Sequence, residues 1–152
     1  MFFKKEVFSF TILDVLEIKQ HNVSMYNKER NFNALSFRFC SDTTIKTEKN
    51  EYRMRDNVLA YVPARLNYKR ESRTEDLISI HFDTISYDTK NIEYFIPNDP
   101  SPFIKLFREI LEIWNKRELG YKYKCSAILY EIFAECYRQN YVSDLQSSKI
   151  RN

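Results

Sequence analysis

The chain of 152 residues is long enough for one domain with a hydrophobic core, or for one domain with a helical appendage. Its apolar content of 43% and aromatic content of 16% exclude an intrinsically disordered protein, and no apolar run reaches the ~18 residues of a membrane span. The net charge of +3, from 24 basic and 21 acidic residues, is smaller and less clustered than a nucleic-acid-binding domain usually carries.

The N-terminal segment, MFFKKEVFSFTILDV, is interrupted by three charged residues at positions 4–6. It lacks the small-residue cleavage site of a signal peptide. Three cysteines, Cys40, Cys125 and Cys136, have no CxxC spacing, which is typical of reduced structural thiols. We therefore expect a cytoplasmic protein that does not enter a membrane.

Short strands are predicted between Phe8 and about Asp83. In ALSFRFC, residues 34–40, apolar and polar residues alternate, which indicates a strand with two different faces. Five further strand-like segments are parted by polar breaks: TTIKT, EYRMR, NVLAYV, RLNYKR and LISIHFD. Closely spaced strands without alternating helices predict an antiparallel sandwich or small barrel. The densest basic segment, YKRESR at residues 68–73, is interpreted as a solvated hairpin end.

A helix is predicted to begin with Ser101 as N-cap and Pro102 as N1. Its apolar residues fall on one side: Phe103, Leu106, Phe107, Ile110, Leu111 and Trp114. The helix is expected to end near Leu119–Gly120, because Gly120 is the only glycine of the chain and lies where a C′ cap would.

A second helix is predicted from about Tyr123 to Asn140, with an apolar arc roughly twice as wide as contact with one sheet face requires. Either it lies between the sheet and the first helix, or part of the arc contacts another protein chain. For the second possibility the candidate interface residues are Tyr123, Ala127, Leu129, Tyr130, Phe133, Ala134 and Tyr137. The polar residues 142–152 are expected to form a linker.

The order of three segments, ALSFRF, EYRMRDNVLAYVPARLNYKR and LISIHFD, resembles the N-terminal regulatory domain of bacterial AraC-type transcription regulators. The helical segment that follows is also similar to this family, so the resemblance covers about Asn31 to Tyr141. Two positions depart from the family pattern: Asp56-Asn57 stands where Gly-Asp is usual, and Ala64 stands where a glycine commonly follows Pro63. Asp and Asn tolerate turn conformations, so the turn is expected to form.

The resemblance implies a mainly β plus α fold, with a cupin-like double-stranded β-barrel (jelly roll) followed by a C-terminal helical hairpin. Residues 1–97 would form the barrel that binds a small effector, and residues 98–141 the helical pair that makes a homodimer. Family members carry helix-turn-helix motifs after a linker, and this chain stops at about that point. We therefore expect the sensor half of a regulator, with DNA binding in a missing C-terminal part.

Six strand residues are candidates for contact with the effector, a sugar or another metabolite: Arg38, Tyr61, Tyr68, Ile78, Ile80 and His81. If residues 36, 38 and 40 face the interior, Arg38 could hold a carboxylate, a phosphate or a sugar hydroxyl. If residues 35, 37 and 39 face inward instead, which simple burial favours, Arg38 is solvated. A lone strand histidine such as His81 is most often structural, although it could donate to an effector at the pocket mouth.

Catalytic cupins hold a divalent metal with an HxH motif, a glutamate and a further histidine. This chain has two histidines, His21 and His81, and no HxH motif. We therefore expect no metal, no cofactor and no catalytic residue. Two alternatives to an effector sensor stay open: a small cupin-fold enzyme, such as a sugar isomerase or dioxygenase, and a ligand-free dimerisation module with a barrel filled by Phe and Tyr.

Overall fold

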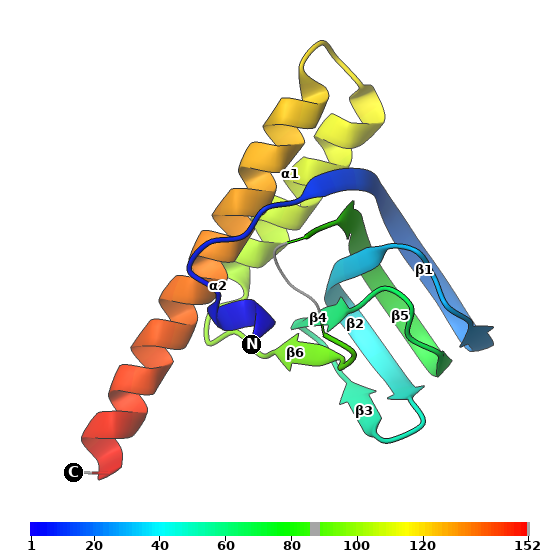
Figure 1. The fold of residues 1–152 in the computed structure, drawn as a ribbon, viewed down its shortest axis with the longest axis horizontal. Helices are drawn as coiled ribbons and strands as arrows, with labels where there is room; N and C mark the ends of the chain where they lie inside the picture. Colours follow the sequence, from blue (N-terminus) through cyan, green and yellow to red (C-terminus); the bar gives the residue numbers. More distant parts are fainter. Residues whose placement is uncertain (86–88, 152) are drawn as a thin grey trace.

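The computed structural model describes the backbone of residues 1–85 and 89–151, and the side chains of these residues as far as Tyr141. In this part of the chain a short 3-10 helix, η1 (Phe2–Lys4), precedes six strands and two helices, α1 (Ser101–Lys116) and α2 (Tyr121–Arg151) (Figure 1). The strands are β1 (Thr11–Asn27), β2 (Asn33–Lys46), β3 (Glu51–Met54), β4 (Val58–Val62), β5 (Tyr68–Asp83) and β6 (Glu93–Phe95).

The strands form one antiparallel sheet in the order β1-β5-β2-β4-β6, and β3 pairs with β2. The predicted mainly β plus α class, with a C-terminal helical hairpin, is confirmed. β1 and β6 end the strand order, and no ladder joins them within the described ranges. The sheet is therefore open, in contrast to the closed double-stranded barrel that was predicted.

Two strands are longer than predicted because they continue through polar segments. ALSFRFC and TTIKT both belong to β2, whereas RLNYKR and LISIHFD belong to β5 from Tyr68 onward. The pairing of β2 with β5 shifts register between Arg38 and Cys40 and again between Asp42 and Thr43. Such bulges bend a strand without ending it. The segment YKRESR therefore forms the first six residues of β5 rather than a hairpin end, with Lys69, Glu71 and Arg73 exposed as expected and Tyr68 and Ser72 buried.

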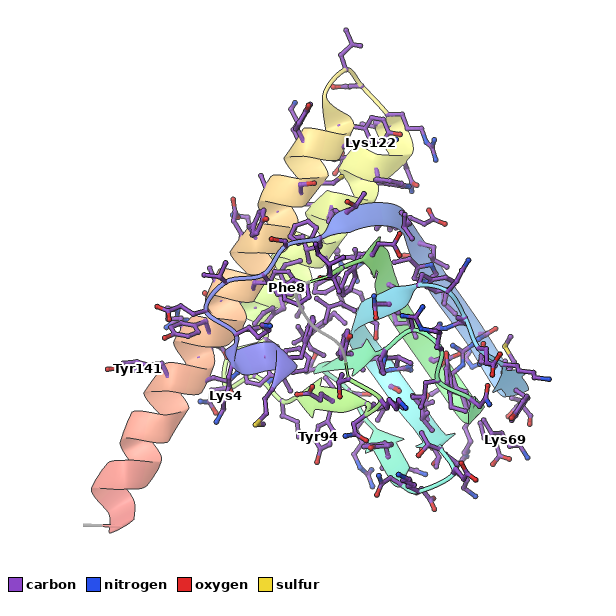
Figure 2. All side chains as sticks on the ribbon, in the orientation of Figure 1. Lys4, Phe8, Lys69, Tyr94, Lys122 and Tyr141 are labelled. Atoms are coloured by element: carbon purple, nitrogen blue, oxygen red, sulfur yellow. The ribbon has the colours of Figure 1, made fainter. Side chains whose placement is uncertain are left out.

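One face of the sheet packs against η1, α1 and α2, and we call the apolar cluster between them the helix-side core. The sheet contributes Leu35, Phe37, Leu59, Tyr61, Ile78, Ile80 and Phe82, all with no exposed surface. The predicted apolar side of α1 faces this cluster, since Phe103, Phe107 and Ile110 are fully buried. Figure 2 shows Phe8 in the same space, between α2 and the sheet.

Helix α1 begins and ends earlier than predicted. Pro100 occupies the N-cap, and the carboxylate of Asp99 accepts a hydrogen bond of 3.0 Å from the backbone N–H of Ser101. At the other end Arg117, not Gly120, takes the left-handed conformation that ends the helix, with φ of 53°. Gly120, with φ of 82°, lies in the turn directly before α2. An arginine can adopt the left-handed conformation at modest cost, so the helix end did not require the glycine and the predicted end near Gly120 is wrong.

Helix α2 continues to Arg151, through the residues 142–151 that were predicted as a linker. Its inner stripe packs on the helix-side core: Ile128, Leu129, Ile132 and Cys136 are buried, and Phe133 is partly buried. The sequence left two positions open for this helix: between the sheet and the first helix, or against another chain. The inner stripe of α2 takes the first of these positions. The other stripe faces outward and is described below.

Candidate functional site

The face of the sheet that points away from the helices carries a second apolar cluster, which we call the far-side core. Its residues are Ile45, Met54, Val58, Ala60, Val62, Tyr68 and Ile92, none more than 7% exposed. Tyr52 from β3 and Leu66 from the segment after β4 pack against it. Because neither helix contributes to this cluster, its enclosure comes from the bent sheet and its connecting segments. The fold therefore has a second interior besides the helix-side core.

A buried ion pair adjoins the far-side core. Arg38 of β2 is 3% exposed and Glu75 of β5 is 1% exposed. Nη1 of Arg38 lies 3.1 Å from Oε2 of Glu75, and Nη2 of Arg70 lies 3.5 Å from the other carboxylate oxygen. Charges cost several kcal/mol to bury unless they are paired, so Glu75 anchors both arginines inside the protein.

Small polar side chains add further hydrogen bonds to this ion pair. Nη1 of Arg38 donates to the hydroxyls of Ser41 and Thr43 at 3.4 Å each, and Ser41 in turn donates to Thr43 at 3.0 Å. The amide of Gln20 on β1 donates to Glu75. These contacts explain why the polar segment SDTT remains within β2: its inward hydroxyls bind the buried charges.

A third arginine, Arg30, extends the cluster to Tyr68, the first residue of β5. Its guanidinium lies 5.2 Å from the ring centroid of Tyr68 and 4.6 Å from that of Phe32. The Phe32 ring stacks on the imidazole of His81 with 4.2 Å between centroids. Burial raises the pKa of Tyr68, and the positive charges of Arg30, Arg70 and Arg38 oppose this rise. The phenol of Tyr68 therefore lies within the electrostatic reach of all three arginines.

The guanidinium groups of this cluster have unused donors. The Nε atoms of Arg30, Arg38 and Arg70, and Nη2 of Arg30, are buried and have no hydrogen-bond partner among the described residues. Burial lowers the pKa of Arg30 and of Arg38, but a guanidinium stays protonated in proteins. Since more than nine tenths of buried polar groups are normally satisfied, the cluster has the capacity to bind an additional acceptor.

The six predicted pocket residues fall on both faces of the sheet. Three lie fully buried in the helix-side core: Tyr61, Ile78 and Ile80. The other three belong to the far side: Arg38 contacts Glu75, Tyr68 contacts Arg30, and His81 stacks on Phe32, which also contacts Arg30. Leu35 and Phe37 face the helix-side core, as simple burial favoured. Arg38 is nevertheless not solvated, because the opposite face of the sheet is also enclosed.

Three members of the cluster were not predicted from the sequence: Arg30, Arg70 and Glu75. All three lie in charged segments, NKERNF and KRESRTED, which have the composition of solvated loops. The one available signal was the position of Glu75, two residues before Leu77 and thus on the same side of a strand. The side of the strand on which Glu75 lies did not reveal that its partner is Arg38, 37 residues away in the sequence.

The histidine of the cluster gives a pH prediction. Burial, followed by the positive charge of Arg30 and opposed by Asp14, lowers the pKa of His81 from 6.5 to about 4. The unfolded chain, with the ordinary pKa, then binds a proton first as the pH falls below 6.5, so the folded state loses stability. Between pH 7 and pH 5 we expect a loss of about 1 kcal/mol, after allowance for solvent screening of a partly exposed ring.

Urea unfolding of the wild type and of His81→Phe at both pH values measures this effect. The variant keeps a ring that can stack on Phe32, but it cannot take up a proton. We therefore expect the free energy of unfolding of the variant to fall less between pH 7 and pH 5 than that of the wild type. An identical pH dependence of both proteins would refute the role given to His81.

Two surface cavities adjoin these features. The first, of about 270 Å³, is lined by residues 47–50, Tyr52, 65–67 and 90–92, and it shares Tyr52, Leu66 and Ile92 with the far-side core. The second, of about 390 Å³, lies between residues 5–9 and α2. The first cavity thus lies over the apolar part of the far-side core, and the second lies beside the outer stripe of α2.

The outer stripe of α2 consists of Tyr123, Ala127, Tyr130, Ala134, Tyr137 and Tyr141, all exposed. Tyr123 is 86% exposed and Tyr130 is 51% exposed. Figure 2 shows Tyr141 on the side of α2 that points away from the sheet. Five of the seven predicted interface residues lie on this stripe, whereas Leu129 is fully buried and Phe133 packs against the helix-side core.

Within residues 1–85 and 89–151, no three His, Cys, Asp or Glu side chains that the structure describes are grouped so that they could hold a metal ion. Neither α1 nor α2, as far as they are described, is long and apolar enough to cross a membrane.

The chain matches no protein-family model, and no curated protein matches it. Among solved structures it is similar to ToxT from Vibrio cholerae, with a TM-score of 0.51 and 10% sequence identity. The match covers 86% of this chain and 57% of the ToxT chain. This likeness shows a shared fold, and the chain spans little more than half the length of that protein.

Proposed function

We propose that this chain is the effector-sensing and dimerisation domain of a bacterial AraC-type transcription regulator. The observation that carries the proposal is the fold likeness to ToxT, an AraC-family regulator, over 86% of the chain. The order of sequence segments that resembles the regulatory domain of this family supports the same conclusion. In this proposal residues 1–97 bind the effector, residues 98–141 form the dimer, and DNA contacts belong to a part outside this chain.

The effector is proposed to bind on the far side of the sheet rather than against the helices. Tyr61, Ile78 and Ile80 are packed among the rings of the helix-side core, so they are withdrawn as contact residues. Arg38, Tyr68 and His81 combine a polar cluster with an apolar wall, as small-molecule sites do. Arg30 and Arg70 join them in the proposed site.

The dimer is proposed to form through the outer stripe of α2, with a second copy of this chain as the partner. From Tyr123 to Tyr137 the stripe spans about 21 Å, the length of four helical turns. Alternating Tyr and Ala allow two such helices to approach closely while each phenol hydroxyl keeps contact with water. In a dimer with two-fold symmetry, the outer stripe of each chain would be covered by the same residues of the other chain.

Charge at the centre of the stripe tests the dimer. We expect Tyr130→Glu combined with Tyr137→Glu to raise the dissociation constant of the dimer by about 100-fold or more, because four carboxylates would meet in one interface. Sedimentation equilibrium measures the change. Lys124→Glu, at an exposed residue of the same helix outside the outer stripe, is the matched control and should leave the dimer intact. A double variant that dimerises as tightly as the wild type would exclude this interface.

The regulatory role can be tested separately. We expect this chain, fused in front of a DNA-binding domain that binds its operator only as a dimer, to restore repression of a reporter gene. The double tyrosine variant in the same fusion should not restore it. A fusion that binds no operator although the wild-type chain is folded would contradict the proposal.

A ligand-free dimerisation module is the second candidate function. It is favoured by the complete filling of the helix-side core, where three predicted pocket residues have no exposed surface. The two candidates differ in the far-side cluster, which only an effector sensor would use for binding.

A further inference from the structure

The far-side cluster has a surplus of positive charge. Arg38 and Arg70 share one buried carboxylate, that of Glu75, and Arg30 lies over the ring of Tyr68, so the three guanidinium groups exceed that carboxylate by two positive charges. Among the neighbouring strand residues, Asp42 pairs with Arg53 and Glu71 pairs with Lys69, whereas the buried Oδ1 of Asp76 accepts no hydrogen bond from the described residues. A protein gains nothing in stability from such a surplus, because unpaired charge is costly to bury.

The unused hydrogen-bond donors lie in the same place as the surplus charge. Arg38 is 3% exposed, and its Nε has no acceptor among the described residues, as is also true of Nε in Arg30 and Arg70. Arg30 lies 5.2 Å from the centroid of the Tyr68 ring, and the positive charges of Arg38 and Arg70 also act on the Tyr68 phenol. An arginine fork matches the planar or tetrahedral oxygens of carboxylates and phosphates.

We propose that the effector is a small oxyanion with about two negative charges, a dicarboxylate or a phosphate monoester, held by Arg30, Arg38 and Arg70 beside Tyr68. This inference rests on the proposed function and specifies its ligand. Two negative charges balance the surplus, and the oxygens take up the unused N–H groups. Glu75 holds two of the arginines in position when the anion is absent.

The cavity of about 270 Å³ is the proposed entrance. Lys49, Arg65 and Lys90 line it with a single carboxylate, that of Glu48, so its rim attracts anions. The backbone N–H of Arg65 donates to the carbonyl of Arg30 at 2.6 Å, which joins the rim directly to the segment that carries the third arginine. Movement of this rim would therefore be transmitted to Arg30.

Thermal unfolding of the purified chain tests the proposal with sodium succinate and with glycerol 2-phosphate as probes. Sodium chloride at equal ionic strength and uncharged succinamide are the controls. We expect a saturable rise of the midpoint by about 3–6 °C at ten times the dissociation constant for at least one probe. A response to succinate alone identifies a carboxylate site, and a response to the phosphate alone identifies a phosphate site. No rise beyond that in sodium chloride would overturn the proposal.

Arg30→Gln distinguishes this cluster from an anion site elsewhere. Because Arg30 makes no ion pair with Glu75 among the described contacts, we expect the variant to stay folded and to lose the probe-dependent rise. Arg73→Gln, at a side chain that is 86% exposed, should keep the full rise. Arg30→Lys retains the charge without the fork, and we expect it to weaken probe binding about tenfold. A rise that persists unchanged in both Arg30 variants would overturn the proposal.

Sedimentation equilibrium on the same samples separates this inference from the proposed function. A dimer that fails to respond to either anion overturns only the ligand assignment. A monomer contradicts the proposed dimerisation whether or not the anion binds. A dimer with an Arg30-dependent response supports both.

Discussion

Replacing Glu75 with glutamine is expected to lower the free energy of unfolding by about 3–5 kcal/mol, which is a large part of the stability of a small domain. The carboxylate is 1% exposed and contacts Arg38 and Arg70. Its loss would leave the buried Arg38 and the largely buried Arg70 without their carboxylate partner. Urea unfolding at pH 7, followed by circular dichroism, measures the change.

Glu71→Gln is the matched control for this prediction. Glu71 lies on the same strand, but its side chain is 45% exposed and its partner is the exposed Lys69. Surface ion pairs contribute little, so we expect a change below about 1 kcal/mol. If Glu75→Gln were as mild as Glu71→Gln, the buried cluster would have no electrostatic importance, and the basis for the anion proposal would disappear with it.

The second large effect is expected at the N-terminus, where Phe2→Ala should cost about 3–5 kcal/mol. Phe2 is 2% exposed and stacks on Tyr61 with 3.9 Å between ring centroids and 7° between the planes. Its ring also meets the edge of Phe8 at 5.2 Å. Removal of the ring would leave a cavity at the junction of the sheet, η1 and α2, which urea unfolding detects as a lower midpoint.

Val7→Ala in the same segment is the control, because Val7 is 78% exposed and should tolerate the change. If Phe2→Ala lowered the free energy of unfolding as little as Val7→Ala, Phe2 would not contribute to the core. The side-chain amide of Asn140 also donates to the carbonyl of Phe3 at 2.9 Å, so the segment is bonded to α2 as well.

This anchoring constrains how an effector would act on the dimer. We propose that binding either repositions the N-terminal segment or shifts the helical pair. A free displacement of residues 1–5 would expose Phe2 and Phe3, at the energetic cost just described. In a full-length regulator, deletion of residues 1–5 that left the effector response intact would therefore assign the signal to the helices instead.

The helix-side core was predictable from periodicity, because its residues repeat at the spacing of regular elements. Phe103, Phe107 and Ile110 recur at helical intervals and are all buried. Leu35 and Phe37 alternate with polar residues and occupy one side of β2. Local apolar patterns of this kind identify both the element and its buried face.

The far-side cluster was not predictable in the same way, because its residues are polar and come from distant parts of the chain. Arg38 and Glu75 are 37 residues apart, and the cation–π contact of Arg30 with Tyr68 also joins separate segments. Polar residues inside β2 and β5 resemble breaks between strands, so both strands were divided too early. The bulges that bend these strands, and thereby enclose the second interior, have no distinct sequence signature here.

Native mass spectrometry of the purified chain, from a volatile buffer near neutral pH, tests the central proposal most directly. We expect a dimer of two 18.5 kDa chains that carries an additional small acidic molecule, and that loses this molecule in the Arg30→Gln variant. A monomer with a tightly bound divalent metal, and without such a molecule, would refute the sensor function and favour a cupin-fold enzyme.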